Sequence, residues 1–158
     1  MAQFTDPAGG KVSIPGVAVG RIRRTLDAEA PPTAHTRVDW AQMTFVQEHP
    51  EPVAQAIKAE LPSLASLHGP DNTPVWFNAK AAQGPLPLSP REVRPGVNSV
   101  IVILNKRQPV RETAEQVAQV LTAAGGTPFP PSPSGIVERS MDAFRSLRQT
   151  LMPMESWE

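Results

Sequence analysis

Short runs of alternating apolar and polar residues dominate the chain, and in two places this pattern gives way to helical spacing. Alternation predicts weak strands over residues 11–14 and 17–23, a main strand over 36–40 and a return strand over 44–47. A helix is expected to begin at Pro50 and run to about residue 60, because proline is well tolerated at the first helical position.

The same succession of patterns recurs further along the chain. Residues 75–82 read as an extended run, 99–104 as a strong strand and 108–111 as a short return strand. Thr113 has the spacing of a capping box with the glutamine three residues later, so a helix is expected from about 114 to 124. The two glycines that follow are typical of a helix end.

The two regions match at identical spacing over one stretch. Residues 46–57 and 110–121 share Val, Glu, Glu, Val, Ala and Gln, and Ile57 stands where the second stretch has Leu121. We interpret this match as an internal duplication, and the alternative is two unrelated strand-to-helix junctions built from common residues. A unit of about 50 residues is marginal alone, so two stacked units would bury more surface.

The expected fold class is therefore α+β, with two tandem repeats that each combine a small antiparallel sheet with one helix. The predicted divisions are residues 1–64 for the first repeat, 65–126 for the second, and 127–158 for a proline-rich spacer and a C-terminal helix arm. The chain has 19 prolines in 158 residues, and four of them lie within 127–134, which predicts a stiff polyproline-like linker.

Residues 134–152 have the spacing of an amphipathic helix. Its apolar face must be buried, either on the body of the same chain or on another subunit, and the sequence leaves both alternatives open. The candidate partner-binding residues are the apolar positions of that face, with the tail tryptophan extending the contact: Val137, Met141, Phe144, Leu147, Leu151 and Trp157.

The only marked basic cluster consists of Arg21, Arg23 and Arg24, and alternation places Arg21 and Arg23 on one face of a strand. The cluster is a candidate contact for a phosphate or an acidic partner. The other interpretation is a solvated edge strand, where charge blocks unwanted pairing. Lys plus Arg and Asp plus Glu both number 15, so the zero net charge argues against a broad nucleic-acid or membrane-surface binder.

We expect no catalytic, cofactor or metal site. The absence of cysteine excludes disulfides and thiolate chemistry, and His35, His49 and His68 do not have metal-ligand spacing. The acidic residues Glu48 and Glu112 stand near expected helix starts, where their interaction with the helix dipole is the favoured role over acid–base catalysis. We find no apolar run of about 18 residues and no pattern of a secretion signal.

One stretch of the second region resembles a known type of small module. It combines an asparagine-containing strand at Phe77 and Asn78, the hydrophobic strand 99–104, a Val-x-Glu-Thr run at 110–113, and a helix that starts Glu-x-Val at 115–117. In this layout it is similar to flagellar FlbD-type small proteins and to uncharacterised phage proteins. The resemblance implies a small sheet-plus-helix unit and covers about 50 residues.

Duplicated units, stiff arms and a spaced amphipathic helix lead us to expect a non-enzymatic virion structural protein. Capsid decoration (cement) in a bacteriophage, or a neck or tail accessory, fits best, with the major capsid protein or copies of the chain itself as partners. We expect no small-molecule substrate and no membrane, and a location in the virion after assembly in the host cytoplasm. The alternative is a cytoplasmic nucleic-acid or regulatory binding module that uses the three arginines.

Overall fold

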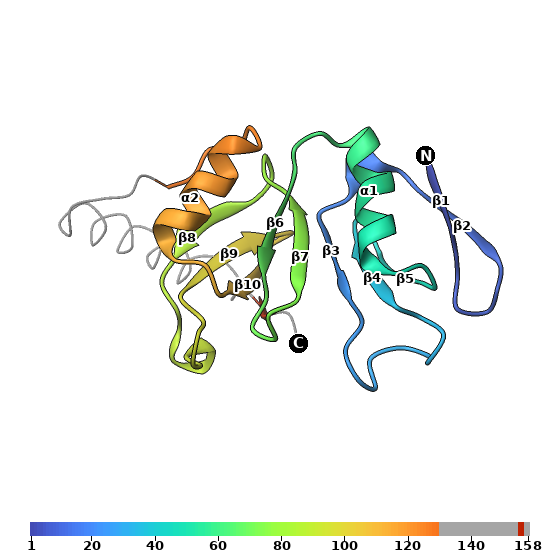
Figure 1. Cartoon of the computed structure of the whole chain (residues 1–158), viewed down its shortest axis with the longest axis horizontal. Helices are drawn as coiled ribbons and strands as arrows, with labels where there is room; N and C mark the ends of the chain where they lie inside the picture. The colour runs from blue at the N-terminus through green and yellow to red at the C-terminus, as the bar shows by residue number, and fades with distance from the viewer. Residues whose placement is uncertain (130–154, 157–158) are drawn as a thin grey trace.

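A computed structural model describes residues 1–129 and 155–156 of the chain. The described part is α+β, with two α-helices and eleven strands in three sheets that are antiparallel apart from the β10–β11 pair (Figure 1). The first half comprises β1 (Ala2–Thr5), β2 (Lys11–Ile14), β3 (Arg21–Arg24), β4 (Thr36–Asp39), β5 (Met43–Val46) and α1 (Pro50–Glu60). The second half comprises β6 (Leu64–His68), β7 (Pro74–Asn78), β8 (Gln83–Leu86), β9 (Ser99–Ile103), β10 (Lys106–Val110) and α2 (Ala114–Ala123).

Each half runs through five strands and one helix in the same order. A hairpin opens each half, and its first strand meets the last strand of that half through one backbone bond. The Gln47 N–H donates to the Thr5 carbonyl at 2.8 Å, and the Arg111 N–H donates to the His68 carbonyl at 2.8 Å. Short 3-10 turns, η1 (Gly16–Ala18) and η2 (Pro90–Glu92), lie in the connections after β2 and β8.

The central sheet crosses from one half to the other. Its strand order is β5-β4-β3-β7-β6, and β3 pairs with β7 so that Ile22 faces Trp76. The Asn78 N–H extends this pairing by donating to the Gly20 carbonyl at 3.1 Å. The expectation that each repeat closes a sheet of its own is therefore wrong, because the β6–β7 hairpin adds its backbone to the sheet of the first half.

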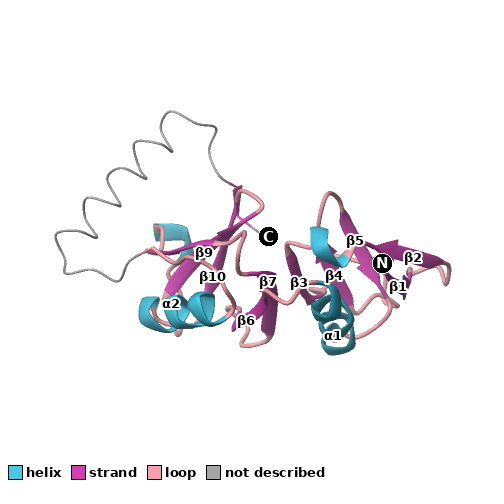
Figure 2. Ribbon diagram, turned by 90° about the horizontal axis from the view of Figure 1, so that it is seen from above, coloured by secondary structure: helices cyan, strands magenta, loops and turns pink. Residues whose placement is uncertain are grey.

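The remaining strands form two smaller sheets. The order β10-β9-β8 makes one, with a bulge in β8 and with the two-residue strand β11 (Glu155–Ser156) beside β10. The β1–β2 hairpin makes the other and projects at one end of the molecule (Figure 1). Seen from above, both helices lie on the same side of the strands (Figure 2).

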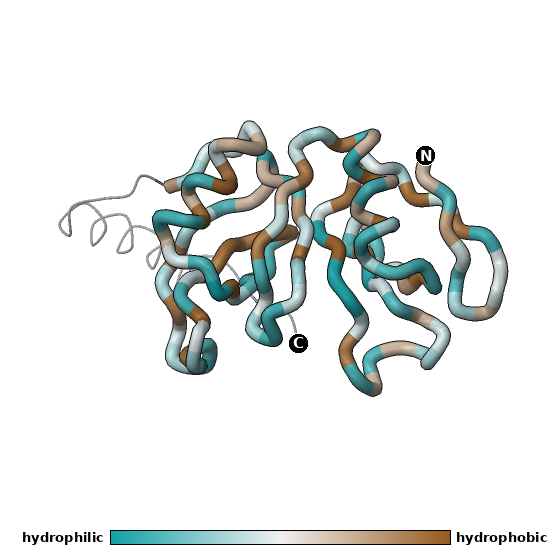
Figure 3. The backbone as a smooth tube through the Cα atoms, in the orientation of Figure 1, coloured by the Kyte–Doolittle hydropathy of each residue, from teal (hydrophilic) through white to brown (hydrophobic). Residues whose placement is uncertain are grey.

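Each half has its own apolar core between its helix and its strands. The continuous hydrophobic run of β9 is visible as a brown stretch in Figure 3. The first core includes Ile14, Ile22, Val38, Val46, Val53 and Ile57. The second includes Phe77, Ile101, Ile103, Val110, Val117 and Leu121. Burial of these side chains is the main favourable contribution to folding, since each contributes about 1.5–3 kcal/mol.

The local signals predicted most elements. Helix α1 begins at Pro50 as expected, and α2 has the capping box in which the Gln116 N–H donates to Thr113. Gly125 has φ +88°, the left-handed conformation expected after a helix. Strands β1, β6 and β8 were missed, and β6 begins at Leu64, at the predicted boundary between the repeats.

The C-terminal part of the predictions falls outside the described residues. This applies to the helix expected over 134–152, and to the candidate contact residues Val137, Met141, Phe144, Leu147, Leu151 and Trp157. The described part of the spacer ends at Phe129, whose ring packs against a small cluster of Leu86, Val100 and Val102.

Candidate interaction surfaces

The arginine cluster of β3 does not form one exposed basic patch. The side chain of Arg21 is fully buried, and that of Arg23 is 8% exposed. Strand β3 lies between β4 and β7, so the expectation of an edge strand is wrong. Alternation does place Arg21 and Arg23 on one face, opposite Ile22, which packs in the first core.

Two carboxylates neutralise the buried arginines. Asp39 pairs with Arg21 through Nη2 at 2.8 Å and accepts a bond from Arg37 Nε at 2.9 Å. Glu29, from the loop between β3 and β4, pairs with both Arg23 and Arg37. The result is a connected set of ion pairs on the face of the sheet that is turned away from α1, and we call it the ionic network.

Burial and pairing shift the ionisation of this network in opposite directions. Desolvation lowers the pKa of Arg21 to about 9, and the neighbouring Asp39 opposes this shift. Burial alone would raise the pKa of Glu29, but bonds from Arg23, the Leu26 N–H and Arg37 together lower it to about 2. Glu29 and Arg21 are therefore both charged at neutral pH.

The ionic network also joins the two halves of the molecule. Arg21 Nη1 donates to Gln108 Oε1 of β10 at 2.6 Å. Leu104, in the β9–β10 turn, lies so close to Gly20 that a Cβ at Gly20 would come within 2.7 Å of it. The start of β3 is thus held both by backbone pairing to β7 and by side chains of the second half.

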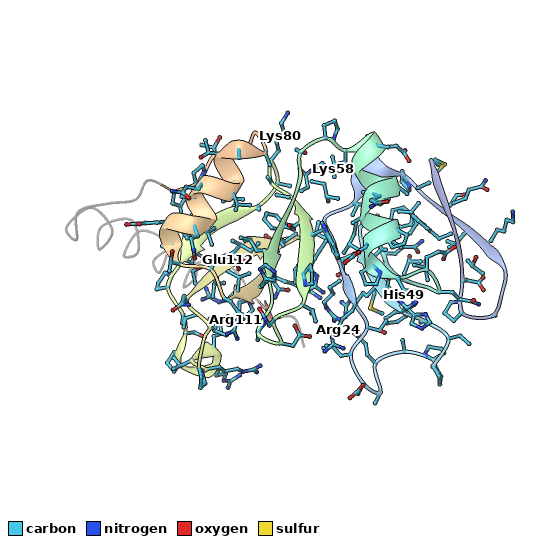
Figure 4. All side chains as sticks on the ribbon, in the orientation of Figure 1. Arg24, His49, Lys58, Lys80, Arg111 and Glu112 are labelled. Carbon is cyan, nitrogen blue, oxygen red and sulfur yellow. The ribbon has the colours of Figure 1, made fainter. Side chains whose placement is uncertain are left out.

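Arg24 is the exposed member of the cluster. Its guanidinium is 42% exposed and pairs with Asp71 of the β6–β7 turn at 2.6 Å. Figure 4 shows Arg24 near the end of α1 that carries His49. Because the other two arginines are buried in ion pairs, the cluster offers one partly neutralised cation to solvent, and this arrangement does not favour a nucleic-acid interface.

An open cleft of about 610 Å³ lies beside Arg24, between the first turn of α1 and the β6–β7 hairpin. The rings of His35 and His49 line it with their centroids 4.3 Å apart. Pro50 and Trp76 add apolar walls, so the cleft suits an apolar side chain better than a charged group. His49 is the N-cap residue of α1.

The two acidic residues near the helix starts bind backbone rather than a substrate. Glu48 accepts the Thr5 N–H at 2.9 Å, and Glu112 accepts the His68 N–H at 2.9 Å. His68 also places its Nδ1 2.7 Å from Glu112. Sequence reasoning expected an interaction with the helix dipole and missed this strand-fixing role, although their matched positions in the two stretches were its signal.

The described residues contain no group of three His, Asp or Glu side chains that could hold a metal ion. Within the same residues, no helix is long and apolar enough to cross a membrane. No family model, no curated protein and no solved structure matches the chain.

The outer edge of β2 is a surface that sequence reasoning did not single out. Within the part of the chain that the structure describes, strand β2 pairs only with β1, and the side chains of Lys11 and Ser13 are exposed. Val12, between them, is half-buried against the first core. Alternation predicted the strand over residues 11–14, but it gave no signal that one edge of this strand is free.

Proposed function

We propose that the two halves are copies of one unit, and that the protein is a non-enzymatic structural protein that binds other protein subunits. Matched hydrogen bonds support the duplication. The Thr36 hydroxyl donates to the Glu48 carbonyl at 2.6 Å, and the Ser99 hydroxyl donates to the Glu112 carbonyl at 2.6 Å. Bonds of this kind do not follow from shared helix propensity, so they favour common descent over chance similarity.

The cores support the same duplication. Residues at corresponding places in the two halves are buried alike, and their side chains have similar volumes. The pairs in the order of the chain are Ile14 with Phe77, Val38 with Ile101, Val46 with Val110, Val53 with Val117, and Ile57 with Leu121.

The observation that carries the functional proposal is the pairing of β3 with β7. This pairing fuses the two units into one body, to which Arg21 and Gln108 add a buried side-chain bond. A fused pair of small units can present a fixed surface to neighbouring subunits at low entropic cost. The predicted helix over 134–152 is part of the proposal, because its apolar positions would supply the main contact.

A bacteriophage particle is the setting that we propose, because duplicated units, proline-stiffened arms and a spaced amphipathic helix suit a chain that covers neighbouring subunits. There the chain would act as capsid decoration (cement) or as a neck or tail accessory. The chain would bind the major capsid protein, or another subunit of the particle, through the C-terminal arm. The apolar residues of that arm, which have helical spacing, suit a groove between subunits.

Co-sedimentation with purified phage shells, necks and tails tests this function. We expect the full chain to co-sediment with one of these particles, and Phe144→Asp to weaken binding by at least about 30-fold, the loss of a single interface hot spot. Asp142→Ala, two residues away on the predicted polar face, is the matched control and should bind like the wild type. Failure of the wild-type chain to bind any of the particles would contradict the proposal.

A further inference from the structure

The free edge of β2 carries unused backbone groups. The Asp6 N–H donates to the Gly10 carbonyl at 2.8 Å and closes the β1–β2 hairpin. In an antiparallel ladder, hydrogen-bonded pairs alternate with non-hydrogen-bonded pairs. Counted from the Asp6–Gly10 bond, Lys11 and Ser13 belong to non-hydrogen-bonded pairs, so their N–H and C=O groups point away from β1. Among residues 1–129 and 155–156, nothing bonds to these groups.

The corresponding edge in the second half is paired. Strand β7 occupies the place in its hairpin that β2 occupies in the first, and its outer edge bonds to β3. Trp76 is the residue of β7 that corresponds to Ser13, and it faces Ile22. The molecule itself therefore shows that this edge of the hairpin accepts a further antiparallel strand.

Strand β8, at the edge of the sheet in the second half, does not offer a free edge of this kind. On the outer edge of β8, the Gly84 carbonyl accepts the Phe129 N–H at 2.7 Å. The next residue, Pro85, has no N–H to donate. Strand β8 is consequently a poorer edge than β2 for pairing with a second copy of the chain.

We propose that β2 pairs antiparallel with β2 of a second copy, about a two-fold axis that passes beside Val12. In this register Lys11 of each copy faces Ser13 of the other. Each N–H and C=O of these two residues then has a partner across the axis, and the two hairpins form one continuous sheet.

The side chains agree with this register. Val12 is half-buried on the face that packs against the first core, beside Phe4 and Ile14, and it meets Val12 of the second copy. Lys11 and Ser13 are exposed on the opposite face, so no like charges stand directly opposite each other. A shift that pairs Lys11 with its own counterpart would juxtapose two cations, and this repulsion selects the Val12-centred register.

A cysteine cross-link tests the pairing, because the chain contains no cysteine of its own. Val12→Cys places one thiol at the axis, where facing Cβ atoms of an antiparallel pair lie ~4.5–5.5 Å apart. Under mild oxidation we expect a disulfide-linked dimer to form at least about tenfold faster than with Gln3→Cys, which lies one strand further from the axis. Equal rates for the two variants would overturn the proposal.

A proline substitution at the same edge gives a second readout. Ser13→Pro removes an N–H that points away from β1, so it leaves the hairpin bonds intact and blocks the outer edge. In sedimentation, we expect the wild type and Ser13→Ala to show concentration-dependent mass above 17.0 kDa, and Ser13→Pro to remain monomeric. Dimerisation of Ser13→Pro to the wild-type extent would also overturn the proposal.

This inference names a second copy as one partner and rests on the proposed binding function for its setting. The two sets of experiments can refute the self-pairing and the structural function independently of each other. Absence of the Val12→Cys cross-link removes the self-pairing alone, whereas absence of binding to phage particles removes the structural function and leaves the measured dimer unaffected.

Discussion

The two halves of the molecule differ most on the sheet face that is turned away from the helices. In the first half this face carries the ionic network, and Arg37 and Asp39 of β4 belong to it. In the second half the corresponding positions on β9 are Val100 and Val102, which pack against Phe129. One backbone arrangement thus tolerates either ion pairs or apolar packing on the same face, provided that a loop or an arm covers it.

The comparison shows how the ion pairs and the apolar packing each depend on the segment that covers the sheet face. Glu29 lies on the loop over the first half and is the only loop residue that binds two of the network arginines, among the contacts of the described residues. In the second half, Arg107 and Glu92 form a buried pair at 2.7 Å beside the apolar cluster. A charged sheet face requires an opposite charge in the loop that covers it, whereas an apolar face requires only apolar side chains that fill the space above it.

The largest expected difference between the halves concerns the loss of one side chain from this face. Asp39→Ala leaves Arg21 and Arg37 without their shared carboxylate, and we expect a loss of about 3–5 kcal/mol in unfolding free energy. Val102→Ala, the counterpart in the second half, should cost about 2 kcal/mol through lost burial and a small cavity. Urea unfolding measures both, and equal costs would contradict the distinction between an ionic and an apolar face.

The second prediction concerns a feature that the two halves share, the carboxylate that accepts a strand N–H. Glu48→Ala and Glu112→Ala each remove the acceptor of a strand N–H, and each should cost about 1–3 kcal/mol. If the two carboxylates have the same role, the two losses agree within about 1 kcal/mol. Glu51→Ala and Glu115→Ala change exposed neighbours and are the controls, with changes within about 0.5 kcal/mol.

The third prediction concerns pH. The folded-state pKa of Glu29 is about 2, below its ordinary value of 4.5, so its contribution is present above about pH 4.5 and is lost as the pH falls toward 2. Burial alone would raise the pKa of Glu92, but bonds from Arg107 and the Ser89 N–H lower it, which gives the same sign. Glu29→Gln should flatten the fall in unfolding free energy between pH 4.5 and 2, measured by urea titration at each pH.

The pH experiment separates the two halves when Glu92→Gln is measured beside Glu29→Gln. Each carboxylate has its own arginine partners, so the two reductions in slope should add in the double variant. A wild-type stability that does not change from pH 5 to 2 would contradict the assignment of both groups.

The smallest expected effects come from the helix caps. The Thr113 hydroxyl accepts a bond from the Gln116 N–H, so Thr113→Ala should cost about 1 kcal/mol. His49 makes no side-chain cap bond, and Pro52 at the third position of α1 has no N–H to offer. His49→Ala should therefore change the cap contribution by less than about 0.5 kcal/mol, and thermal unfolding of the two variants ranks them.

The sequence predicted those parts of the fold that depend on local chemistry. Pro50, Thr113 and Gly125 fix helix ends through their own backbone or hydroxyl groups, so the pattern around them was sufficient. Strands β1, β6 and β8 are no shorter than the strands that were predicted, and they were missed because the stability of each depends on pairing with a neighbouring strand. Such pairing is a tertiary effect, and β propensity alone is a weak guide to it.

The candidate site shows the same limit more sharply. Alternation placed Arg21 and Arg23 on one face, but it gave no sign that Asp39 and Glu29 neutralise them there. The partner of Arg21 in the other half, Gln108, is 87 residues away in the chain. The exposure of a charged strand residue depends on such distant partners, so the sequence alone did not distinguish a solvated arginine from a buried one.

The β3–β7 joint has a consequence for how the protein tolerates change. Its bonds join main-chain atoms, and they require only that the residues at Ile22 and Trp76 keep an extended conformation. Partly exposed positions of these strands, such as Trp76, can therefore change without separating the two halves, whereas the buried Arg21 and Ile22 cannot change so freely. The fused arrangement of the two halves can thus be kept while the residues at such positions change.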